Sequence, residues 1–351
     1  MLVGRAGPAF ALGAALLFGL SAPAAKLLVG TIDPWLLAGL LYLGSGLGLG
    51  LYRVGRRFVG DTPTETALAS HDLPWLAGAI LVGGGVGPVL LMFALAWGPA
   101  AQSALLLNLE GVFTVLLAWM VFREHVDARV ATGMAVIAVG AMVLAWRGSS
   151  PTRLDWSAAL VAGACVAWAV DNNLTRKVSA ADPVQIAAWK GVVAGTVNVL
   201  VALARGAVWP PAGALLSAAL VGLLGYGTSL VLFVLGLRHL GAARTGIYFG
   251  TAPFVGALGG VLALGEAVTP HLLVGGVLMA AGVGLSLTER HTHAHVHGPL
   301  EHEHLHWHDE HHQHDHPPGG PEPEPHTHRH EHRALRHRHP HHPDLHHRHP
   351  H

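Results

Sequence analysis

The sequence contains few charged residues: Asp, Glu, Lys and Arg make up 12% of its 351 residues, whereas soluble globular domains usually contain about 25%. It has a single cysteine, Cys165, so no intrachain disulfide can form. Cysteine usage therefore does not indicate whether the compartment is oxidising or reducing. It also lacks a Gly-x-x-x-x-Gly-Lys phosphate-binding loop, and its apolar part has no paired catalytic histidines or nucleophile motif. These absences argue against ATP-driven chemistry and against an enzyme.

Long apolar runs fill the chain up to about residue 288. The apolar content of this part is higher than the 51% of the whole chain. A membrane-spanning helix needs roughly 17–25 mostly apolar residues. A soluble helical core is the alternative, but so many apolar segments cannot all be buried in one domain of this size. We therefore predict an all-α integral membrane protein with ten spans, at 7–29, 35–52, 74–96, 101–122, 129–147, 157–175, 184–204, 212–236, 242–264 and 270–288.

The charges between these spans predict their orientation. With the N-terminus in the cytoplasm, most Lys and Arg flank the inner helix ends, as the positive-inside rule requires. The outer ends hold only Lys26, Arg147, Arg153 and Arg205. Because the number of spans is even, we expect both termini in the cytoplasm and the protein in the inner (plasma) membrane. A rival interpretation treats Arg5, the first apolar run and Ala22-Pro23-Ala24 as a cleaved secretory signal.

An internal repeat argues against the signal-peptide interpretation. The stretch Phe18–Pro23, followed by Lys26, is echoed in mid-chain by Trp168–Asn173, followed by Arg176. A second echo aligns Glu124 with Glu266 and Gly140 with Gly282 at one shared offset. Each half has five predicted spans, and an odd number inverts the second half in the membrane, a recurring transporter architecture. The expected domains are a first repeat at 1–147, a linker at 148–156, a second repeat at 157–288 and a tail at 289–351.

These motifs resemble the EamA-type transporters of the drug/metabolite transporter superfamily. The resemblance rests on the five-plus-five layout, on Phe18-Gly19-Leu20-Ser21 with Lys26, and on Glu124 and Glu266, each followed by a Gly-rich final helix. Thr251-Ala252-Pro253-Phe254 also looks like the family's proline-bearing ninth helix. The resemblance implies a ten-helix fold and the transport of small metabolites, often as export driven by an ion gradient. The first half departs from the pattern, because it has Glu110-Gly111 where the second half has Ala252-Pro253.

Polar residues inside the spans are the candidates for transport. A charge at the bilayer centre costs from about 2.5 kcal/mol upward, so such residues normally face a cavity or a partner. The expected cavity residues are Glu110, Asn108, Gln102, Asp171, Asn172, Lys190, Lys26 and Thr251. Helical spacing predicts that Ser103, Leu107, Glu110 and Thr114 share one face.

Each of these side chains also has a purely structural interpretation. Glu110 would pair with Lys190 or a backbone carbonyl, and Lys190 would instead extend to the lipid headgroups. Lys26 would anchor the first span at the interface, and Asp171 would belong to the inner mouth of the sixth. Glu124 and Glu266 are interpreted as loop and cap residues that pair with nearby Arg.

The C-terminal tail has a different composition, because all but four of the 28 histidines lie at 291–351. No apolar periodicity remains there, which predicts disorder. Histidines at alternate positions of an extended chain point to one side, and neutral imidazole suits zinc, copper, nickel and cobalt. The expected metal ligands are His291, His293, His295, His297, His302, His304, His306, His308, His326, His328, His330 and His332. A cationic patch on the anionic inner leaflet is the alternative role for the tail.

The sequence thus predicts a secondary transporter, and specifically an exporter, of small metabolites, with a metal-binding tail and no required cofactor. One alternative is a transporter of Ni, Co or Zn, with the tail collecting the ion. Another is a metal-responsive membrane protein without transport activity. The expected partners are a small-molecule or ion cargo and the lipid bilayer, with a homodimer left open and no nucleic acid.

Overall fold

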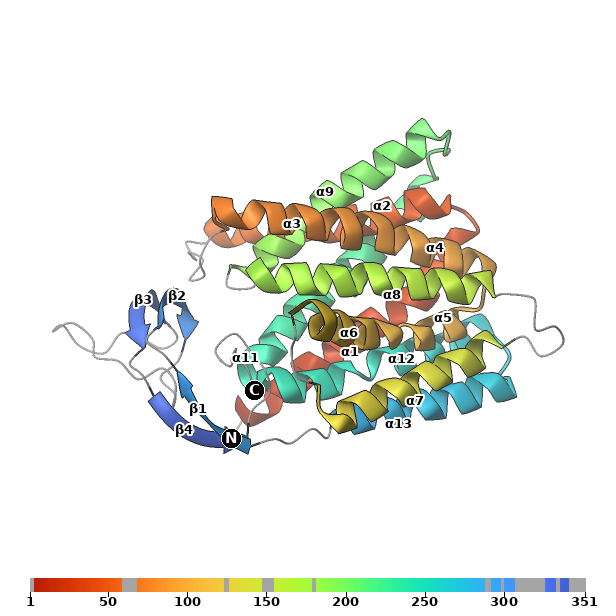
Figure 1. Cartoon of the computed structure of the whole chain (residues 1–351). Coiled ribbons are helices and arrows are strands. Elements are labelled where there is room, and N and C mark those ends of the chain that lie inside the picture. The colour runs from red at the N-terminus through yellow and green to blue at the C-terminus, as the bar shows by residue number, and fades with distance from the viewer. Residues whose placement is uncertain are drawn as a thin grey trace.

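The computed structural model describes the backbone over most of the chain. The described residues are 3–58, 68–122, 126–146, 155–178, 181–287, 292–297, 300–306, 326–332 and 335–340. Helices occupy the described chain up to residue 287, and short strands follow (Figure 1).

The helices of the first half differ in length because two of its spans are interrupted. The α-helices are α1 (Val3–Val29), α2 (Pro34–Phe58), α3 (Leu73–Ala79), α4 (Gly87–Trp97), α5 (Ala100–Leu106), α6 (Leu109–Phe122) and α7 (Ala128–Ala145). A short 3-10 helix, η1 (Ser70–Asp72), precedes α3, and a π-helical turn, η2 (Ile80–Val86), joins α3 to α4.

The second half follows the same order of elements. Its α-helices are α8 (Trp156–Thr175), α9 (Pro183–Ala204), α10 (Ala212–Val221), α11 (Ser229–Phe249), α12 (Ala252–Leu264) and α13 (Pro270–Leu287). A 3-10 helix, η3 (Arg176–Val178), follows α8, and a second π-helical turn, η4 (Gly222–Thr228), joins α10 to α11.

Acidic residues just before several helices explain where those helices begin. The Asp33 carboxylate accepts the Trp35 N–H at 3.0 Å, and the Asp182 carboxylate accepts the Val184 N–H at 2.8 Å. Both residues precede a proline, whose fixed φ suits the first helical turn. The side chain satisfies backbone donors that the helix itself leaves unpaired. The Asp-Pro pairs that mark loops in the sequence are therefore N-terminal caps of α2 and α9.

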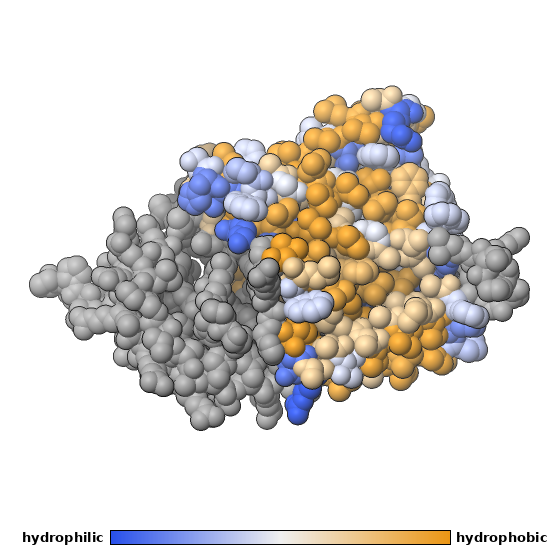
Figure 2. All heavy atoms as spheres, in the orientation of Figure 1, coloured by the Kyte–Doolittle hydropathy of each residue, from blue (hydrophilic) through white to orange (hydrophobic). Residues whose placement is uncertain are grey.

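The described helices include segments that match a membrane in length and composition. Stretches that are long and apolar enough to cross it are Gly7–Val29, Pro34–Arg56, Ser70–Trp97, Ala100–Val121, Ala128–Ala145, Pro183–Ala204 and Ala212–Gly236. Each overlaps a predicted span. Figure 2 shows apolar residues over most of the visible face of these helices, with hydrophilic residues gathered toward its ends. Leucines such as Leu51 and Leu262 are 73% and 74% exposed, as expected for side chains that face lipid.

The helix α11 contains a reversal of the chain. The rings of Phe233 and Phe249 pack with their centroids 4.7 Å apart. At a rise of about 1.5 Å per residue, a straight helix would separate these residues by about 24 Å. A Cβ built on Gly236 would likewise lie 3.1 Å from the Thr245 side chain. The segment therefore turns back on itself between Gly236 and Thr245, where two separate spans are predicted.

Glycines at the contact between the two halves allow their helices to approach closely. The helix α2 packs against α9, and α7 packs against α13. A Cβ on Gly46 would lie 2.3 Å from the Val192 nitrogen, and a Cβ on Gly133 would lie 2.6 Å from the Gly282 carbonyl oxygen. Because any larger residue would clash with backbone there, these contacts explain part of the high glycine content.

Two spans are broken near their middle. The helix ends at Leu106 and starts again at Leu109 in the first half, and the second half is interrupted at Gly250 and Thr251. Our prediction that Ser103, Leu107, Glu110 and Thr114 share one face took the helix to be continuous here, and it stays a prediction. The break lies inside that stretch, and periodicity alone assumes an uninterrupted helix.

The tail departs from the predicted disorder, because its described residues form strands. These are β1 (Thr292–His297), β2 (Leu300–His306), β3 (His326–His332) and β4 (Leu335–Pro340). The strand β1 pairs antiparallel with β4, and β2 pairs antiparallel with β3. The alternation of histidine with other residues has the two-residue period of a strand, which the argument from composition did not consider.

Candidate functional site

The first polar cluster surrounds Glu110, in the first turn of α6. Its Oε1 accepts a hydrogen bond from the Asn172 side-chain amide of α8 at 2.8 Å. The same amide lies 3.4 Å from the Thr114 hydroxyl, one turn further along α6. The helix break places Glu110 at the start of a new helix, where its N–H bonds to the Leu107 carbonyl at 3.0 Å. Glu110 and Asn172, both expected in the cavity, are thus in direct contact.

A buried ion pair lies on the same helix as Asn172. Lys190 Nζ of α9 lies 2.6 Å and 2.7 Å from the two carboxylate oxygens of Asp171. The Thr175 hydroxyl donates to Asp171 at 2.8 Å. The Asp171 side chain is only 6% exposed and that of Lys190 is 18% exposed. The structural interpretation in which Lys190 pairs with Glu110 is therefore wrong, because Asp171 takes the ammonium group.

The charges of this cluster do not balance. Asp171 and Lys190 neutralise one another, whereas Glu110 has an amide donor and forms no ion pair with any described residue. Glu110 is half-buried. A carboxylate in a spanning segment is costly unless a positive partner or a proton compensates it. The cluster can therefore take up a proton or a positively charged group at Glu110.

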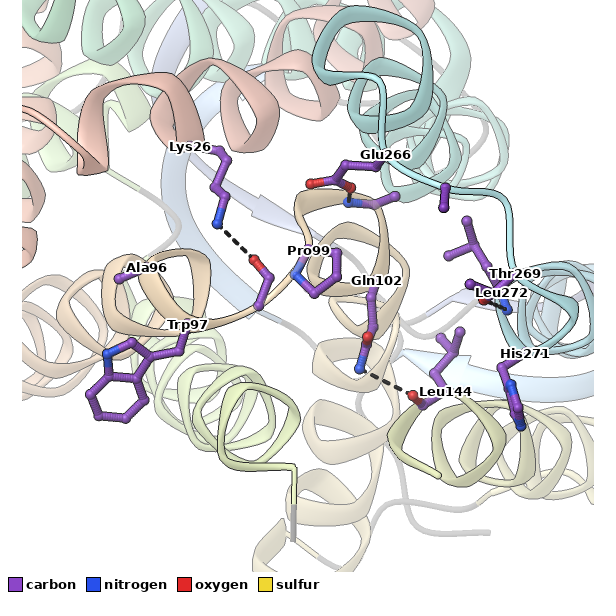
Figure 3. A pocket seen from close by; sticks show the side chains of 13 residues that line it. Lys26, Ala96, Trp97, Pro99, Gln102, Leu144, Glu266, Thr269, His271 and Leu272 are labelled. Atoms are coloured by element: carbon purple, nitrogen blue, oxygen red, sulfur yellow. Dashed lines mark hydrogen bonds between the residues drawn. The ribbon is translucent and has the colours of Figure 1, made fainter. Parts of the chain in front are cut away.

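A second polar region lines a cavity of about 460 Å³ at the end of α1 and the turn between α4 and α5. In Figure 3, Lys26 and Glu266 approach this turn from different elements, whereas Gln102 of α5 points toward Leu144. Lys26 Nζ donates to the Leu95 carbonyl and, at 2.9 Å, to the Gly98 carbonyl. Lys26 therefore holds the end of α4 and contributes a positive charge to the cavity wall.

Glu266 links the two halves at this cavity. Its carboxylate oxygens accept the N–H groups of Ala100 and Ala101 at 2.6 and 2.7 Å. Glu266 follows Gly265, whose φ of 67° ends α12. The predicted cap role is thus seen in Glu266, but the helix it caps is α5, in the other half. Glu124 lies outside the described residues.

The remaining expected cavity residues are distributed between the cavity and the helix breaks. The Gln102 amide donates to the Leu144 carbonyl at 3.1 Å and to Asp155 at 2.9 Å, beside the cavity. Asn108 donates to the Leu105 carbonyl at 2.9 Å, and the Thr251 hydroxyl donates to the Tyr248 carbonyl at 2.6 Å. Asn108 and Thr251 therefore add a side-chain donor to carbonyls at the two helix breaks that also accept their backbone N–H groups.

Sequence reasoning missed three polar residues that hold this arrangement together. Asp155 is 3% exposed and Asn198 is also 3% exposed. The Trp168 ring N–H donates to the Gly83 carbonyl at 3.0 Å. Of these three residues, Asn198 could have been recognised from the sequence, because an amide in the middle of an apolar span needs buried hydrogen-bond partners.

Comparison with known proteins identifies the fold. The model of the EamA-like transporter family matches this chain twice, at residues 5–146 and 155–288. The chain belongs to the EamA-like transporter family. It is 26% identical over 290 residues to an "Uncharacterized transporter" of Methanothermobacter thermautotrophicus, covering 77% of this chain and 82% of that protein. It is 31% identical over 217 residues to a "Probable terminal-alkyne amino-acid exporter" of Streptantibioticus cattleyicolor, covering 61% of this chain and 73% of the relative.

A solved structure titled "Crystal structure of protein" superposes with a TM-score of 0.60 at 19% identity, covering 81% of this chain and 99% of that chain. This likeness concerns the fold alone. The resemblance to the drug/metabolite transporter superfamily is confirmed by the family match, and the protein is a multi-pass membrane protein. The family and both relatives are transporters, which points away from an enzyme.

The described helices offer no group of three or more His, Cys, Asp or Glu that would hold a metal ion. The expected ligands are confined to the tail, where His291 and His308 lie outside the described residues and only the backbone of the others is described. Cofactor and metal binding therefore stay predictions.

Proposed function

We propose that this protein is a secondary transporter that exports small metabolites, and that Glu110 couples export to a proton or to the cargo itself. The observation that carries the proposal is the uncompensated Glu110 carboxylate. It lies beside a broken helix, accepts one amide bond from Asn172, and adjoins a neutral Asp171–Lys190 pair. Broken helices that line a cavity near the repeat interface are a common transporter site.

We also propose that the chain has ten spans in two inverted repeats, an arrangement that suits a secondary transporter. The described helices include seven long apolar stretches, α12 and α13 are shorter apolar helices, and α8 has 20 residues. The reversal within α11 supplies the boundary between the eighth and ninth spans. The two family matches, at 5–146 and 155–288, each cover five of the predicted spans. An odd number of spans in each repeat would invert the second one.

We infer that the cargo is a small amphoteric metabolite of the amino-acid class. One relative is named an amino-acid exporter. The cavity contains the Lys26 ammonium and the Glu266 carboxylate, which suit the two charged ends of such a cargo, and its volume is within the usual range for small-molecule sites. Lys26 would attract the carboxylate of the cargo and Glu266 its ammonium group, whereas Glu110, outside this cavity, would take up a proton or a positively charged group.

Counterflow in liposomes tests this function. Purified protein would be reconstituted with a high internal concentration of one unlabelled amino acid, and uptake of the labelled form would be followed with and without a pH gradient. Accumulation that exceeds that in protein-free liposomes supports transport. No counterflow for any amino acid, together with flux of Ni, Co or Zn, would instead favour the metal-transporter alternative.

Reporter fusions test the membrane arrangement. We expect fusions at Arg57, Arg153, Arg238 and the C-terminus to report inside, outside, inside and inside, because the loop charges favour a cytoplasmic N-terminus. A C-terminus outside the cytoplasm, or a mature chain that starts near Ala25, would support the cleaved-signal interpretation instead.

A further inference from the structure

The two π-helical turns occupy equivalent positions in the two halves. The turn η2 starts at Ile80 and η4 starts at Gly222, and this displacement equals that between Glu124 and Glu266. Both turns have seven residues. π-Helical segments are rare and occur frequently at functional sites, because the wider turn disturbs the regular hydrogen bonds of the helix. Because this rare geometry occurs at both equivalent positions, we interpret it as a shared feature of the two repeats.

Each turn lies on helices of the other half. The turn η2 packs against α8 and α9, and η4 packs against α1 and α2. A Cβ on Gly83 of η2 would lie 2.1 Å from an Asp171 oxygen, and a Cβ on Gly222 of η4 would lie 2.1 Å from the Leu41 carbonyl oxygen. Movement of one half against the other would therefore change the packing of both turns.

The two turns differ in the hydrogen bonds that hold them. In η2, the Gly83 carbonyl accepts the Trp168 ring N–H at 3.0 Å, and the Gly84 carbonyl accepts the Asn198 amide at 3.1 Å. Both donors come from the second half, and the Tyr42 hydroxyl of α2 lies 3.4 Å from the same Gly83 carbonyl. Within the described residues, the side-chain hydrogen bond to a carbonyl of η4 comes from the same half, where the Ser229 hydroxyl donates to the Gly225 carbonyl at 2.5 Å.

The sequence explains this difference. Phe18 occupies the repeat position of Trp168, and Leu49 occupies that of Asn198 when Asp33 is aligned with Asp182. Neither Phe18 nor Leu49 has a side-chain donor. Phe18 instead packs edge-on against Tyr226 of η4, with the ring centroids 6.1 Å apart. Two aromatic rings can shift against each other and stay in contact. A hydrogen bond has a narrow range of distance and angle, so it holds the accepting carbonyl in place.

We propose that Trp168 and Asn198 are positioning residues that hold η2 rigid, so that η4 is the turn that bends first when the halves move. Trp168 lies one helical turn from Asp171 on α8, so the donor that fixes η2 and the charged cluster share one rigid helix. The two halves therefore contribute unequally to the conformational change, although their backbones are alike.

Hydrogen exchange of the full chain in lipid nanodiscs tests the proposal, and it needs no cargo, so it is independent of transport. In the wild type, amides at 222–228 should exchange faster than those at 80–86. Trp168→Phe keeps an aromatic ring and removes the donor, and it should raise exchange at 80–86 by about five-fold, the equivalent of one lost hydrogen bond. Exchange at 222–228 should not change.

Two further variants keep the test decisive. Trp189→Phe is the matched control, because Trp189 is 52% exposed on α9 and makes no contact with η2 carbonyls. Asn198→Leu installs the residue of the first half, and it should loosen η2 even if Trp168→Phe does not fold. Equal exchange of the two turns in the wild type, or an η2 that neither variant loosens, would overturn the proposal.

Discussion

The two halves of this transporter share a backbone plan and differ in where their charges lie. Each half has a π-helical turn, followed by a span that breaks near its middle. Glu110 lies directly after Leu109, where the helix restarts in the first half, and Ala252 occupies the repeat position of Glu110 in the second half. At the position of Asp171, the first half has Ser21. The two halves thus share the order of their turn and break, whereas Glu110 and Asp171 each occur in one copy only.

The largest effect should come from unbalancing the ion pair that only one half contains. Asp171→Asn leaves the Lys190 ammonium in a largely buried site without its counter-charge. Breaking a buried pair from one side typically costs about 3–5 kcal/mol. We therefore expect a large loss of thermal stability in detergent, measured by the temperature at which the protein aggregates.

The double variant Asp171→Asn with Lys190→Met is the control for this prediction. It removes both charges and should recover most of the lost stability, because replacing a whole buried pair with uncharged residues is often neutral. A double variant as unstable as the single one would show that the pair acts through packing. Ser21→Asp, which places an unpaired carboxylate at the equivalent position of the first half, should be destabilising in the same way.

The second effect concerns Glu110, whose counterpart in the other half is neutral. Glu110→Gln keeps the shape and the contact with Asn172 but removes the charge. If Glu110 couples export to protons, transport driven by a pH gradient should fall at least about ten-fold, with normal expression and preserved exchange of cargo. Liposome uptake with and without the gradient measures this. Asp127→Asn, at the cap of α7, is the matched control, and driven transport by Glu110→Gln at the wild-type rate would assign Glu110 a structural role.

Hydropathy and turn signals predicted the helical segments well, because a spanning segment must satisfy its own backbone hydrogen bonds and carry an apolar surface. Asp33 and Asp182 marked the starts of α2 and α9 for the same local reason. The broken helix at Leu107 and Asn108 was missed, because nothing in the local periodicity distinguishes a break from a continuous turn. The strands of the tail were missed because their pairing is not local.

The candidate residues were found, but their partners were not. Glu110, Asp171, Asn172 and Lys190 are recognisable as polar residues in apolar runs. That Lys190 selects Asp171 over Glu110 depends on how α9 lies against α8, which a single sequence does not specify. The cap that Glu266 provides for α5 is likewise a contact between halves.

The third effect is smaller and concerns the cap at the cavity. Glu266→Ala removes the acceptor for the Ala100 and Ala101 N–H groups, and loss of a cap typically costs about 0.5–2 kcal/mol. We expect a modest loss of thermal stability, together with faster hydrogen exchange at 100–106. Glu266→Gln, which retains an acceptor, is the control. Glu124→Ala is the equivalent change in the first half. An equal loss of stability there would indicate that Glu124 also caps a helix.

The smallest effect on both halves should come from removing the tail. The family matches end at residue 288, so deletion of 291–351 should leave the helical domain inserted, with unchanged thermal stability. The same deletion should abolish binding of zinc, copper or nickel, which we propose for the tail because its histidines alternate along β1–β4 and include the opposed pairs His302–His330 and His304–His328.

Acid should have the same effect on the tail as truncation. Neutral imidazole binds metal and the protonated form does not, so binding should be strong near pH 7.5 and largely lost by about pH 5. Equilibrium dialysis of the full chain against zinc at both pH values, with the truncated chain as control, measures this. Zinc retained by the truncated chain would locate a metal site within the two halves, where the described helices show no suitable cluster, and would favour the metal as cargo. Zinc bound by the full chain alone, without a change in amino-acid counterflow, would separate the tail from the transport path.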